Sequence, residues 1–209
     1  MKSVLISIRP KWCDLIAKGE KTIDVRKTHP KLQTPFRVYI YRTKGTVPHI
    51  INGKWVQMKV GGTVIGEFIC DKVYELVNAF GGIMFADENL NQLEPQLFRD
   101  MSCLTDEQTA DYFGDKDGYG LHITDLKIYD KPRELSEFWA YNEELHKRYD
   151  SERDFCCYDD TNEHGESLTD CGDAYNNILN CYRCWEEWSG WCHHVTRPPQ
   201  SWCYVEELE

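Results

Sequence analysis

Short runs of apolar residues, many of them β-branched or aromatic, recur along the chain and are separated by turn residues. They predict strands over residues 4–8, 36–42, 63–73, 119–123, 126–129 and 201–205. Gly45, Asn52-Gly53 and Gly61-Gly62 mark the basic stretch 44–62 as a loop or hairpin, whereas residues 77–99 show no clear pattern. Many short strands with few helices predict a mainly β, α+β domain built as a small β-barrel.

Short helices are predicted beside these strands. Pro10 favours a helix start, an apolar stripe at i, i+3 and i+4 begins at Trp12, and Gly19 suits the end of the helix. A second helix should begin at Thr105, where a capping box is present, and end at Gly114.

Residues 19–27 stand out because their alternation puts polar side chains in a row. In a strand, Ile23 and Val25 point to one face. The other face carries a hydroxyl, a carboxylate and a guanidinium, with an ammonium just before them: Thr22, Asp24, Arg26 and Lys21. The two cations can hold phosphate, and the hydroxyl and carboxylate can contact a base or a ribose. The alternative is an exposed strand face on which the carboxylate pairs with a neighbouring cation.

Positive and negative charges are unevenly distributed along the chain. Residues 1–60 contain 13 Lys and Arg against three acids, a net of +10, although the whole chain carries −11. The remainder therefore carries −21. Such asymmetry indicates a polyanion-facing surface in the first part of the chain, unless the opposite charges pair across the fold.

Seven of the ten cysteines crowd into residues 156–203, whereas Cys13, Cys70 and Cys103 are isolated and are predicted to be small core residues. Clustered cysteines in a cytosolic protein suggest a metal before disulfides. A C-x2-C pair is the commonest half of a tetrahedral zinc site. We expect a structural zinc ion bound by Cys171, Cys181, Cys184 and Cys192, with Cys156, Cys157, His193 and His194 as alternative ligands. The competing interpretation is reduced thiols packed among tryptophans.

Residues 139–194 differ in character from the rest of the chain. They contain 4 basic and 13 acidic residues, a net of −9, and too few aliphatic residues for a core of their own. A bound metal would supply the folding free energy that such a core cannot. Trp185 and Trp188 lie three residues apart, which favours a helical stripe packed on other residues over a base-stacking surface.

Several stretches, in order, resemble ASCH (activating signal cointegrator homology) domains. Residues 19–26, GEKTIDVR, are similar to the GxKxxExR signature of that family. The later stretches GYGLHI, IYDKP, LSEF and RPPQSWCYV look like a bacterial and phage-associated branch; they lie at residues 118–123, 128–132, 135–138 and 197–205.

The resemblance covers residues 1–138 and 195–209, so residues 139–194 look like an insertion. It implies a PUA-like β-barrel with a cleft that is lined by the signature and binds RNA or a nucleotide. The side chains expected to contact the ligand, or to add charge at its rim, are Arg9, Lys21, Thr22, Asp24, Arg26 and Lys27.

The signature departs from the family at one position. The family usually has glutamate where this chain has Asp24, whose carboxylate is one methylene closer to the backbone. One branch of the family hydrolyses acetylcytidine with a lysine, a threonine and a glutamate. Its lysine matches Lys21, its threonine falls on Asp24, and its glutamate has no secure match. Binding is therefore favoured over turnover; the enzymatic alternatives, with Lys21 and Asp24 as catalytic residues, are an amidohydrolase acting on acylated nucleosides and a nuclease.

A second alternative is a protein-interaction adaptor that works through the Cys- and Trp-rich insertion. No stretch of the chain approaches the roughly 20 apolar residues of a membrane span. Residues 1–10 lack the pattern of a signal peptide. We therefore expect a soluble, cytoplasmic protein that makes no contact with membranes.

Overall fold

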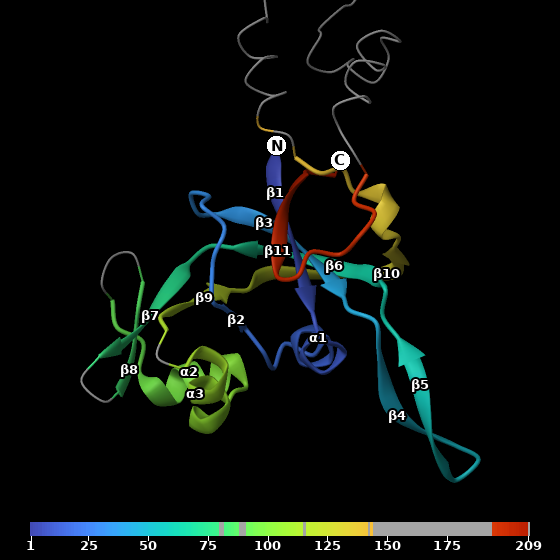
Figure 1. Ribbon diagram of the computed structural model, residues 1–209, viewed down its shortest axis with the longest axis horizontal. Helices are drawn as coiled ribbons and strands as arrows, with labels where there is room; N and C mark the ends of the chain where they lie inside the picture. The colour runs from blue at the N-terminus through green and yellow to red at the C-terminus, as the bar shows by residue number, and fades with distance from the viewer. Residues whose placement is uncertain (80–81, 88–90, 115, 142, 144–193, 209) are drawn as a thin grey trace, which may run out of the picture. The chain divides into compact units, whose positions relative to one another are not determined.

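The computed structural model describes residues 1–79, 82–87, 91–114, 116–141, 143 and 194–208 (Figure 1). The chain divides into two units, Met1–Phe138 with Val195–Glu209, and Trp139–His194. Nearly all of the second unit lies outside the described residues, so the helices and strands below belong to the first.

The larger sheet has five strands and includes the first and last strands of the first unit (Figure 1). Its order is β10-β6-β3-β1-β11, with β1 parallel to β3 and all other neighbours antiparallel. In that order the strands are Thr124–Arg133, Thr63–Cys70, Phe36–Arg42, Lys2–Ile8 and Trp202–Glu206. Helix α1, Pro10–Ala17, follows β1 and forms part of the crossover that a parallel pair requires.

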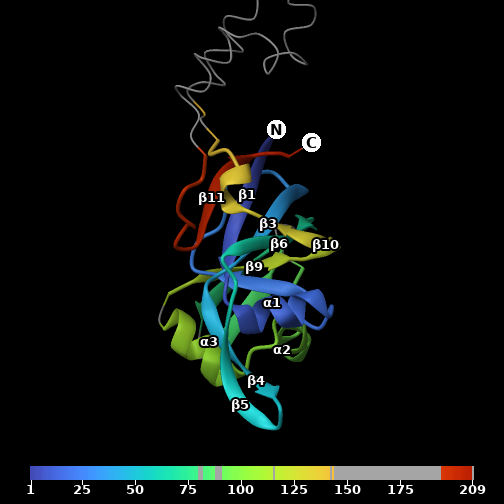
Figure 2. The same cartoon turned by 90° about the vertical axis from the view of Figure 1, so that its right-hand side faces the viewer.

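The smaller sheet has four antiparallel strands in the order β2-β9-β7-β8. These are Ile23–Arg26, Gly118–His122, Val73–Ala79 and Gly82–Ala86. Helices α2, Pro95–Ser102, and α3, Asp106–Phe113, lie beside this sheet (Figures 1 and 2). A single 3-10 turn, Leu135–Glu137, follows β10.

Two clusters of buried apolar side chains hold these layers together. The first joins the larger sheet to α1 and β9; its members include Val4, Ile6, Cys13, Ile16, Val38, Ile40, Phe68, Leu121 and Ile123. The second joins the smaller sheet to α2 and α3, and there the Phe85 and Phe98 rings stack with centroids 3.7 Å apart. A Cβ at Gly118 would overlap the Phe113 ring, so β9 needs glycine where α3 packs against it.

Strands β4, Gly45–Ile51, and β5, Lys54–Val60, form a separate hairpin that projects from the two larger sheets (Figures 1 and 2). Asn52 and Gly53 form its two-residue turn, with φ values of 51° and 74°. Type I′ turns require such positive values, which asparagine and glycine tolerate best. Of the two possibilities predicted for residues 44–62, a loop or a hairpin, the structure has the hairpin.

The predicted mainly β fold is confirmed, but the sheets do not close into the predicted barrel. β10 and β11 are the outer strands of the larger sheet, and β2 and β8 are the outer strands of the smaller one. The stretch 63–73, predicted as a single strand, ends at Cys70 and resumes as β7 at Val73. This break carries the chain from one sheet to the other, so the strands are divided between two open sheets.

The capped helix predicted from Thr105 to Gly114 is confirmed as α3. The Gln108 amide donates to Thr105 Oγ1 at 3.1 Å, and the Thr105 amide donates to Gln108 Oε1 at 3.2 Å. Residues 77–99, which lack a clear sequence pattern, contain the end of β7, all of β8 and the start of α2.

In the second unit, the described residues include Trp139 and His194, which form an antiparallel bridge with ring centroids 3.6 Å apart. Most of the remaining insertion lies outside the described residues. None of the helices in the described part of the chain is long and apolar enough to cross a membrane.

Candidate functional site

The segment that leads into β2 is held in place by backbone hydrogen bonds. Gly19, with φ of 74°, ends α1, and the Lys21 amide donates to the Leu15 carbonyl at 3.2 Å. The Thr22 amide donates to the Met101 carbonyl at 2.8 Å, and Thr22 in turn accepts from the Ile123 amide at 2.8 Å. Thr22, which is half-buried, therefore links the segment through its backbone to α2 and to the residue that follows β9.

Asp24 and Arg26 lie on the same face of β2, as the alternation predicts, and they pair with each other. Arg26 Nε donates to Asp24 Oδ2 at 2.6 Å, and the two residues are only 7% and 5% exposed. The remaining guanidinium nitrogens donate to the Ser201 carbonyl at 3.1 Å and the Ser7 carbonyl at 3.0 Å. Arg26 thus connects β2 to the end of β1 and to the start of β11. The carboxylate pairs as in the alternative interpretation, but inside the protein and not on an exposed face.

Lys21 is more deeply buried than either member of this pair, at 2% exposed. Its Nζ donates to the carbonyl of Ser102, the last residue of α2, at 2.7 Å and lies 5.2 Å from the centroid of the Trp12 ring. A helix C-terminus carries partial negative charge and so favours a cation. Burial nevertheless lowers the pKa of Lys21, whereas the Asp24 carboxylate and Cys103 raise it.

The site holds more buried positive than negative charge. Of the described residues, the buried charged ones are Lys21, Asp24, Arg26 and Asp87, and the first three belong to this one segment. Arg26 pairs with Asp24, whereas Lys21 forms no ion pair with a described residue and interacts with Asp24 only electrostatically. Removal of a charge from water costs free energy unless a partner compensates it, so a surplus of buried cation is a feature of sites that bind or transform a ligand.

Exposed groups extend this positive charge to the surface. Arg9, the residue before α1, and Lys27, the residue after β2, are both exposed. Lys27 Nζ lies 5.2 Å from the centroid of the Tyr112 ring in α3. Burial raises the pKa of Tyr112, and Arg26, Asp24 and Arg9 all act on it electrostatically. Tyr112 therefore lies among the charged groups of the site.

Sequence reasoning missed three residues of the site: Trp12, Ser102 and Tyr112. The sequence places Trp12 in an apolar helical stripe, and Ser102 contributes a backbone carbonyl that any residue could supply. Tyr112 follows Thr109 by three positions in the capped helix and so shares its face, but the burial of Thr109 is known only from the structure.

The cysteines proposed as metal ligands cannot be placed in this site. Cys171, Cys181, Cys184 and Cys192 lie outside the described residues, as do Cys156, Cys157 and His193. Cys13, Cys70, Cys103 and Cys203 are free thiols. Cys13 and Cys70 are buried as expected, whereas Cys103, also predicted to be a core residue, is only half-buried, because it follows the last turn of α2. Among the described residues, no three His, Cys, Asp or Glu side chains lie close enough to bind a metal ion together.

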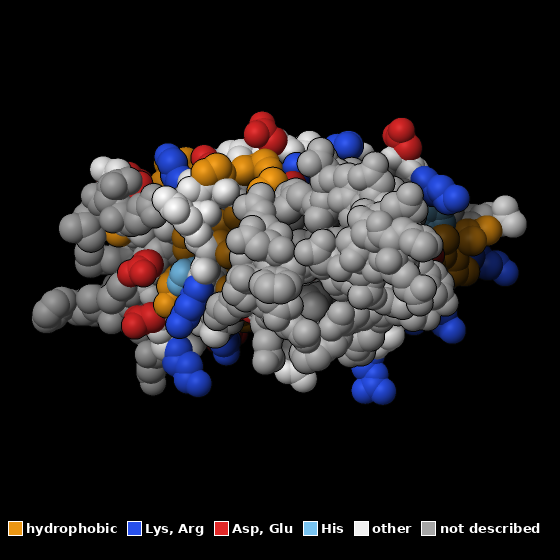
Figure 3. Space-filling view, turned by 90° about the horizontal axis from the view of Figure 1, so that it is seen from above, with side chains coloured by type: hydrophobic (Ala, Val, Ile, Leu, Met, Phe, Trp, Pro, Cys, Tyr) orange, Lys and Arg blue, Asp and Glu red, His pale blue; other side chains and the backbone are white. Residues whose placement is uncertain are grey.

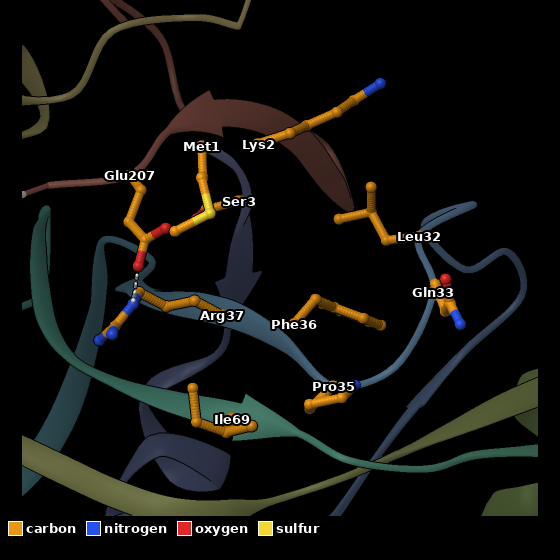
Figure 4. A pocket seen from close by; sticks show the side chains of 10 residues that line it. All are labelled: Met1, Lys2, Ser3, Leu32, Gln33, Pro35, Phe36, Arg37, Ile69 and Glu207. Carbon is orange, nitrogen blue, oxygen red and sulfur yellow. Dashed lines mark hydrogen bonds and ion pairs between the residues drawn. The ribbon is translucent and has the colours of Figure 1, made fainter. Parts of the chain in front are cut away.

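A hollow of about 430 Å³ opens elsewhere, at one end of strands β1, β3 and β6 of the larger sheet (Figure 4). Leu32, Phe36 and Ile69 contribute apolar side chains to its wall. Arg37 Nε donates to Glu207 Oε1 at 2.9 Å across one side of it. None of the six residues expected to contact a ligand lines this hollow, so it is not the cleft that the family resemblance implies.

Comparisons with known proteins find similarity in structure only. No family model matches the chain, and no curated protein sequence matches it. A solved ASCH structure from Zymomonas mobilis is similar at 19% identity and a TM-score of 0.45, over 64% of this chain and 73% of that one. Two single-residue variants of that protein are similar at 20% and 22% identity, with TM-scores of 0.44 and 0.43. They cover 65% and 64% of this chain and 77% and 74% of theirs. These similar structures are ASCH proteins, the family that the motifs at residues 19–26 and beyond also resemble.

Proposed function

We propose that this protein binds RNA or a nucleotide, with a phosphate of the ligand held by the cations around β2. The observation that carries the proposal is the surplus of buried positive charge: Arg26 pairs with the buried carboxylate of Asp24, whereas the buried Lys21 forms no ion pair with a described residue. A phosphate is the natural complement, because it supplies both the missing negative charge and acceptors for the ammonium hydrogens.

The groups around this centre suit the rest of a nucleotide. In the described part of the chain, Ser102 O is the hydrogen-bond acceptor of Lys21 Nζ, and an ammonium has three hydrogens to donate. Arg9 and Lys27 add exposed charge for neighbouring phosphates. Tyr112, 40% exposed, offers an aromatic face, and Thr22 and Asp24 remain the candidates for contact with base or ribose.

The test is the binding of a fluorescently labelled RNA oligonucleotide, with unlabelled mononucleotide as competitor, to the wild type and to Lys21→Met. The variant should bind at least about tenfold more weakly, because a charge-assisted hydrogen bond to phosphate is lost. Affinity should also fall as salt rises, since phosphate binding releases counterions. Lys18→Met is the matched control, because it removes an exposed lysine three residues earlier and should leave affinity unchanged.

The stability of Lys21→Met distinguishes a binding residue from a structural one. The unfolding free energy should stay within about 1 kcal/mol of the wild type, because loss of the bond to Ser102 is offset by removal of a costly buried ammonium. Unchanged RNA and mononucleotide affinity in a folded Lys21→Met variant would overturn the proposal. Capture of a protein partner that survives this substitution, without RNA binding, would favour the adaptor instead.

A second candidate is hydrolysis of an acylated nucleoside or of RNA. The lowered pKa of Lys21 favours it, because an amine that loses its proton more easily can take part in proton transfer. Asp24 counts against it, since Arg26 already occupies Oδ2 of the carboxylate that would have to act as base or nucleophile. Turnover of acetylcytidine or RNA that disappears in Lys21→Met would replace binding with catalysis as the function.

For the insertion we propose one structural zinc ion, supported by the spacing of Cys181 and Cys184 and by the cysteines around them. The thiolates would hold the ion, and the ion would supply folding free energy. Metal analysis of the purified protein, before any chelator is added, should find about one equivalent of zinc. Less than about half an equivalent would contradict the proposal.

A further inference from the structure

The β4–β5 hairpin carries large apolar side chains that no other described strand covers. Trp55 is 71% exposed, Ile50 53% and Met58 41%. A two-stranded hairpin buries little surface of its own, and exposed side chains of this size usually mark a site of interaction. The hairpin is therefore a candidate surface for a partner.

The charge of the hairpin restricts the class of partner. Lys44, Lys54 and Lys59 lie on it or at its base, and residues 36–66 contain no aspartate or glutamate. Hydrophobic and Lys or Arg side chains gather on the visible face at the right-hand end of Figure 3, where the hairpin projects. A surface with lysines and without acids complements a polyanion.

The register of the hairpin separates its two faces. Trp55 lies opposite Ile50, Gln57 opposite Pro48, and Lys59 opposite Thr46. Because side chains alternate along a strand, Trp55, Gln57 and Lys59 share one face, and that face extends about 13 Å. The opposite face of β5 carries Lys54 and the apolar Val56 and Met58. One face thus has an aromatic ring, an amide and an ammonium in a row.

The base of the hairpin adjoins the cations of the site at β2. A Cβ on Gly45 would lie 3.2 Å from Cγ of Pro10, the first residue of α1. Arg9, at the rim of that site, immediately precedes Pro10. A polyanion that reaches Arg9 therefore has the start of the hairpin beside it.

We infer that the β4–β5 hairpin binds single-stranded nucleic acid through the face that carries Trp55, Gln57 and Lys59. An unpaired base stacks on the Trp55 ring, the Gln57 amide hydrogen-bonds a base edge, and Lys59 contacts a phosphate. A single strand fits better than a duplex, because stacking on an exposed tryptophan needs a base whose face is free. This surface extends the proposed function, since it contacts nucleotides other than the one held at Lys21.

The inference is tested with labelled 12-nucleotide RNA and DNA single strands and with the corresponding duplex, bound to the full chain at several salt concentrations. Trp55→Ala should weaken single-strand binding by about tenfold, the size expected for one stacked base, whereas Trp55→Phe should stay within about threefold of the wild type. Lys59→Gln should reduce the dependence of log affinity on log salt by about 0.7, the value for one phosphate contact on a single strand.

Two controls come from the chain itself. Lys54→Gln makes the same change on the opposite face of the hairpin and should reduce the salt dependence by less than Lys59→Gln does. Lys116→Gln makes it at an exposed site away from the hairpin and should leave affinity unaltered. Mononucleotide affinity should be the same in Trp55→Ala as in the wild type, because the site at Lys21 is intact. This separates failure of the hairpin from failure of the proposed function.

Other outcomes overturn the inference. Single-strand affinity unchanged in both Trp55→Ala and Lys59→Gln would show that the hairpin does not bind nucleic acid. Tighter binding of the duplex, lost in the same variants, would replace stacking with groove recognition. Self-association that Trp55→Ala abolishes, without any change in nucleic-acid affinity, would assign the hairpin to contact between copies of this chain.

Discussion

Asp24 and Arg26 form an ion pair whose burial makes it sensitive to the loss of either partner. Asp24→Asn should lower the free energy of unfolding by about 3 kcal/mol, because Arg26 and Lys21 would remain buried without a carboxylate. Asp106→Asn is the control, because it breaks the ion pair between Asp106 and Arg99, whose side chains are 79% and 33% exposed respectively. This substitution should lower the free energy of unfolding by less than about 1 kcal/mol. Urea denaturation of the two variants compares them, and an equal loss in both would mean that the β2 pair contributes no more than a surface contact.

Two buried thiols should make the protein less stable in alkali. Burial raises the pKa of Cys13 and of Cys70 from 9.0 to about 12. Above pH 9 the unfolded chain therefore releases protons that the folded chain keeps, so the free energy of unfolding falls as pH rises from 9 towards 12. At pH 10.5 the loss should be about 2 kcal/mol for each thiol.

The measurement is chemical denaturation under reducing conditions at about pH 8 and pH 10.5. Cys13→Ala with Cys70→Ala should be less stable than the wild type at the lower pH, because methyl-sized cavities remain. Its further loss at the higher pH should nevertheless be smaller. The same loss in wild type and variant would exclude these thiols as the cause of alkaline destabilisation.

For individual residues, the alternation of apolar and polar positions was sufficient to predict that Asp24 and Arg26 lie on one face of a strand. It could not show that both are buried, because burial depends on β1 and β11, whose Ser7 and Ser201 carbonyls receive the Arg26 guanidinium. The partner of Lys21, the Ser102 carbonyl, is 81 positions away, and no local pattern encodes such a contact.

Among the elements, α3 is the one whose ends depend most clearly on identifiable residues. Thr105→Ala should lower the free energy of unfolding by about 1 kcal/mol, because the Gln108 amide at the N-terminus of the helix loses its acceptor. Thr105→Ser keeps the hydroxyl and should retain most of the stability. Thermal unfolding followed by circular dichroism compares them; equal midpoints for the alanine and serine variants would mean that the capping hydroxyl contributes little.

The elements that were predicted well are those with local signals at their ends. The capping box of α3 and the Asn52-Gly53 turn of the hairpin are of this kind, because both are encoded within a few residues. The division of the stretch 63–73 at Cys70 was not predicted, since apolar residues continue on both sides of it. Which sheet each half joins is decided by pairing with β3 and β9, far away in sequence.

In the molecule as a whole, positive and negative charge lie in different segments of the chain. The first 60 residues carry +10 and supply Lys21, Arg26, Arg9 and the hairpin lysines, whereas the insertion carries −9. The charge asymmetry visible in the sequence therefore survives in the fold as a cationic site and a cationic hairpin. Pairing across the fold accounts for part of it, as in the bridges from Arg37 to Glu67 and Glu207.

The insertion should be removable without loss of the first unit. The Val195 amide donates to the Phe138 carbonyl at 2.8 Å, and Trp139 bridges His194, so the two ends of the insertion meet. A chain in which Asn-Gly replaces residues 140–193 would close this bridge with a two-residue hairpin turn. Its midpoint of thermal unfolding should lie within a few degrees of the wild type, and it should bind no zinc.

The same shortened chain tests the electrostatic role of the insertion. Its net charge rises from −11 to −2, so RNA should bind several-fold more tightly at low salt, and the difference should vanish at high salt, where distant charges are screened. A Gly- and Ser-rich segment of the original length is the control, because it removes the charge but keeps the bulk. If that control binds RNA like the wild type while the shortened chain binds more tightly, the insertion acts by obstruction. If both bind more tightly at low salt alone, its acidic residues set the affinity of the cationic site.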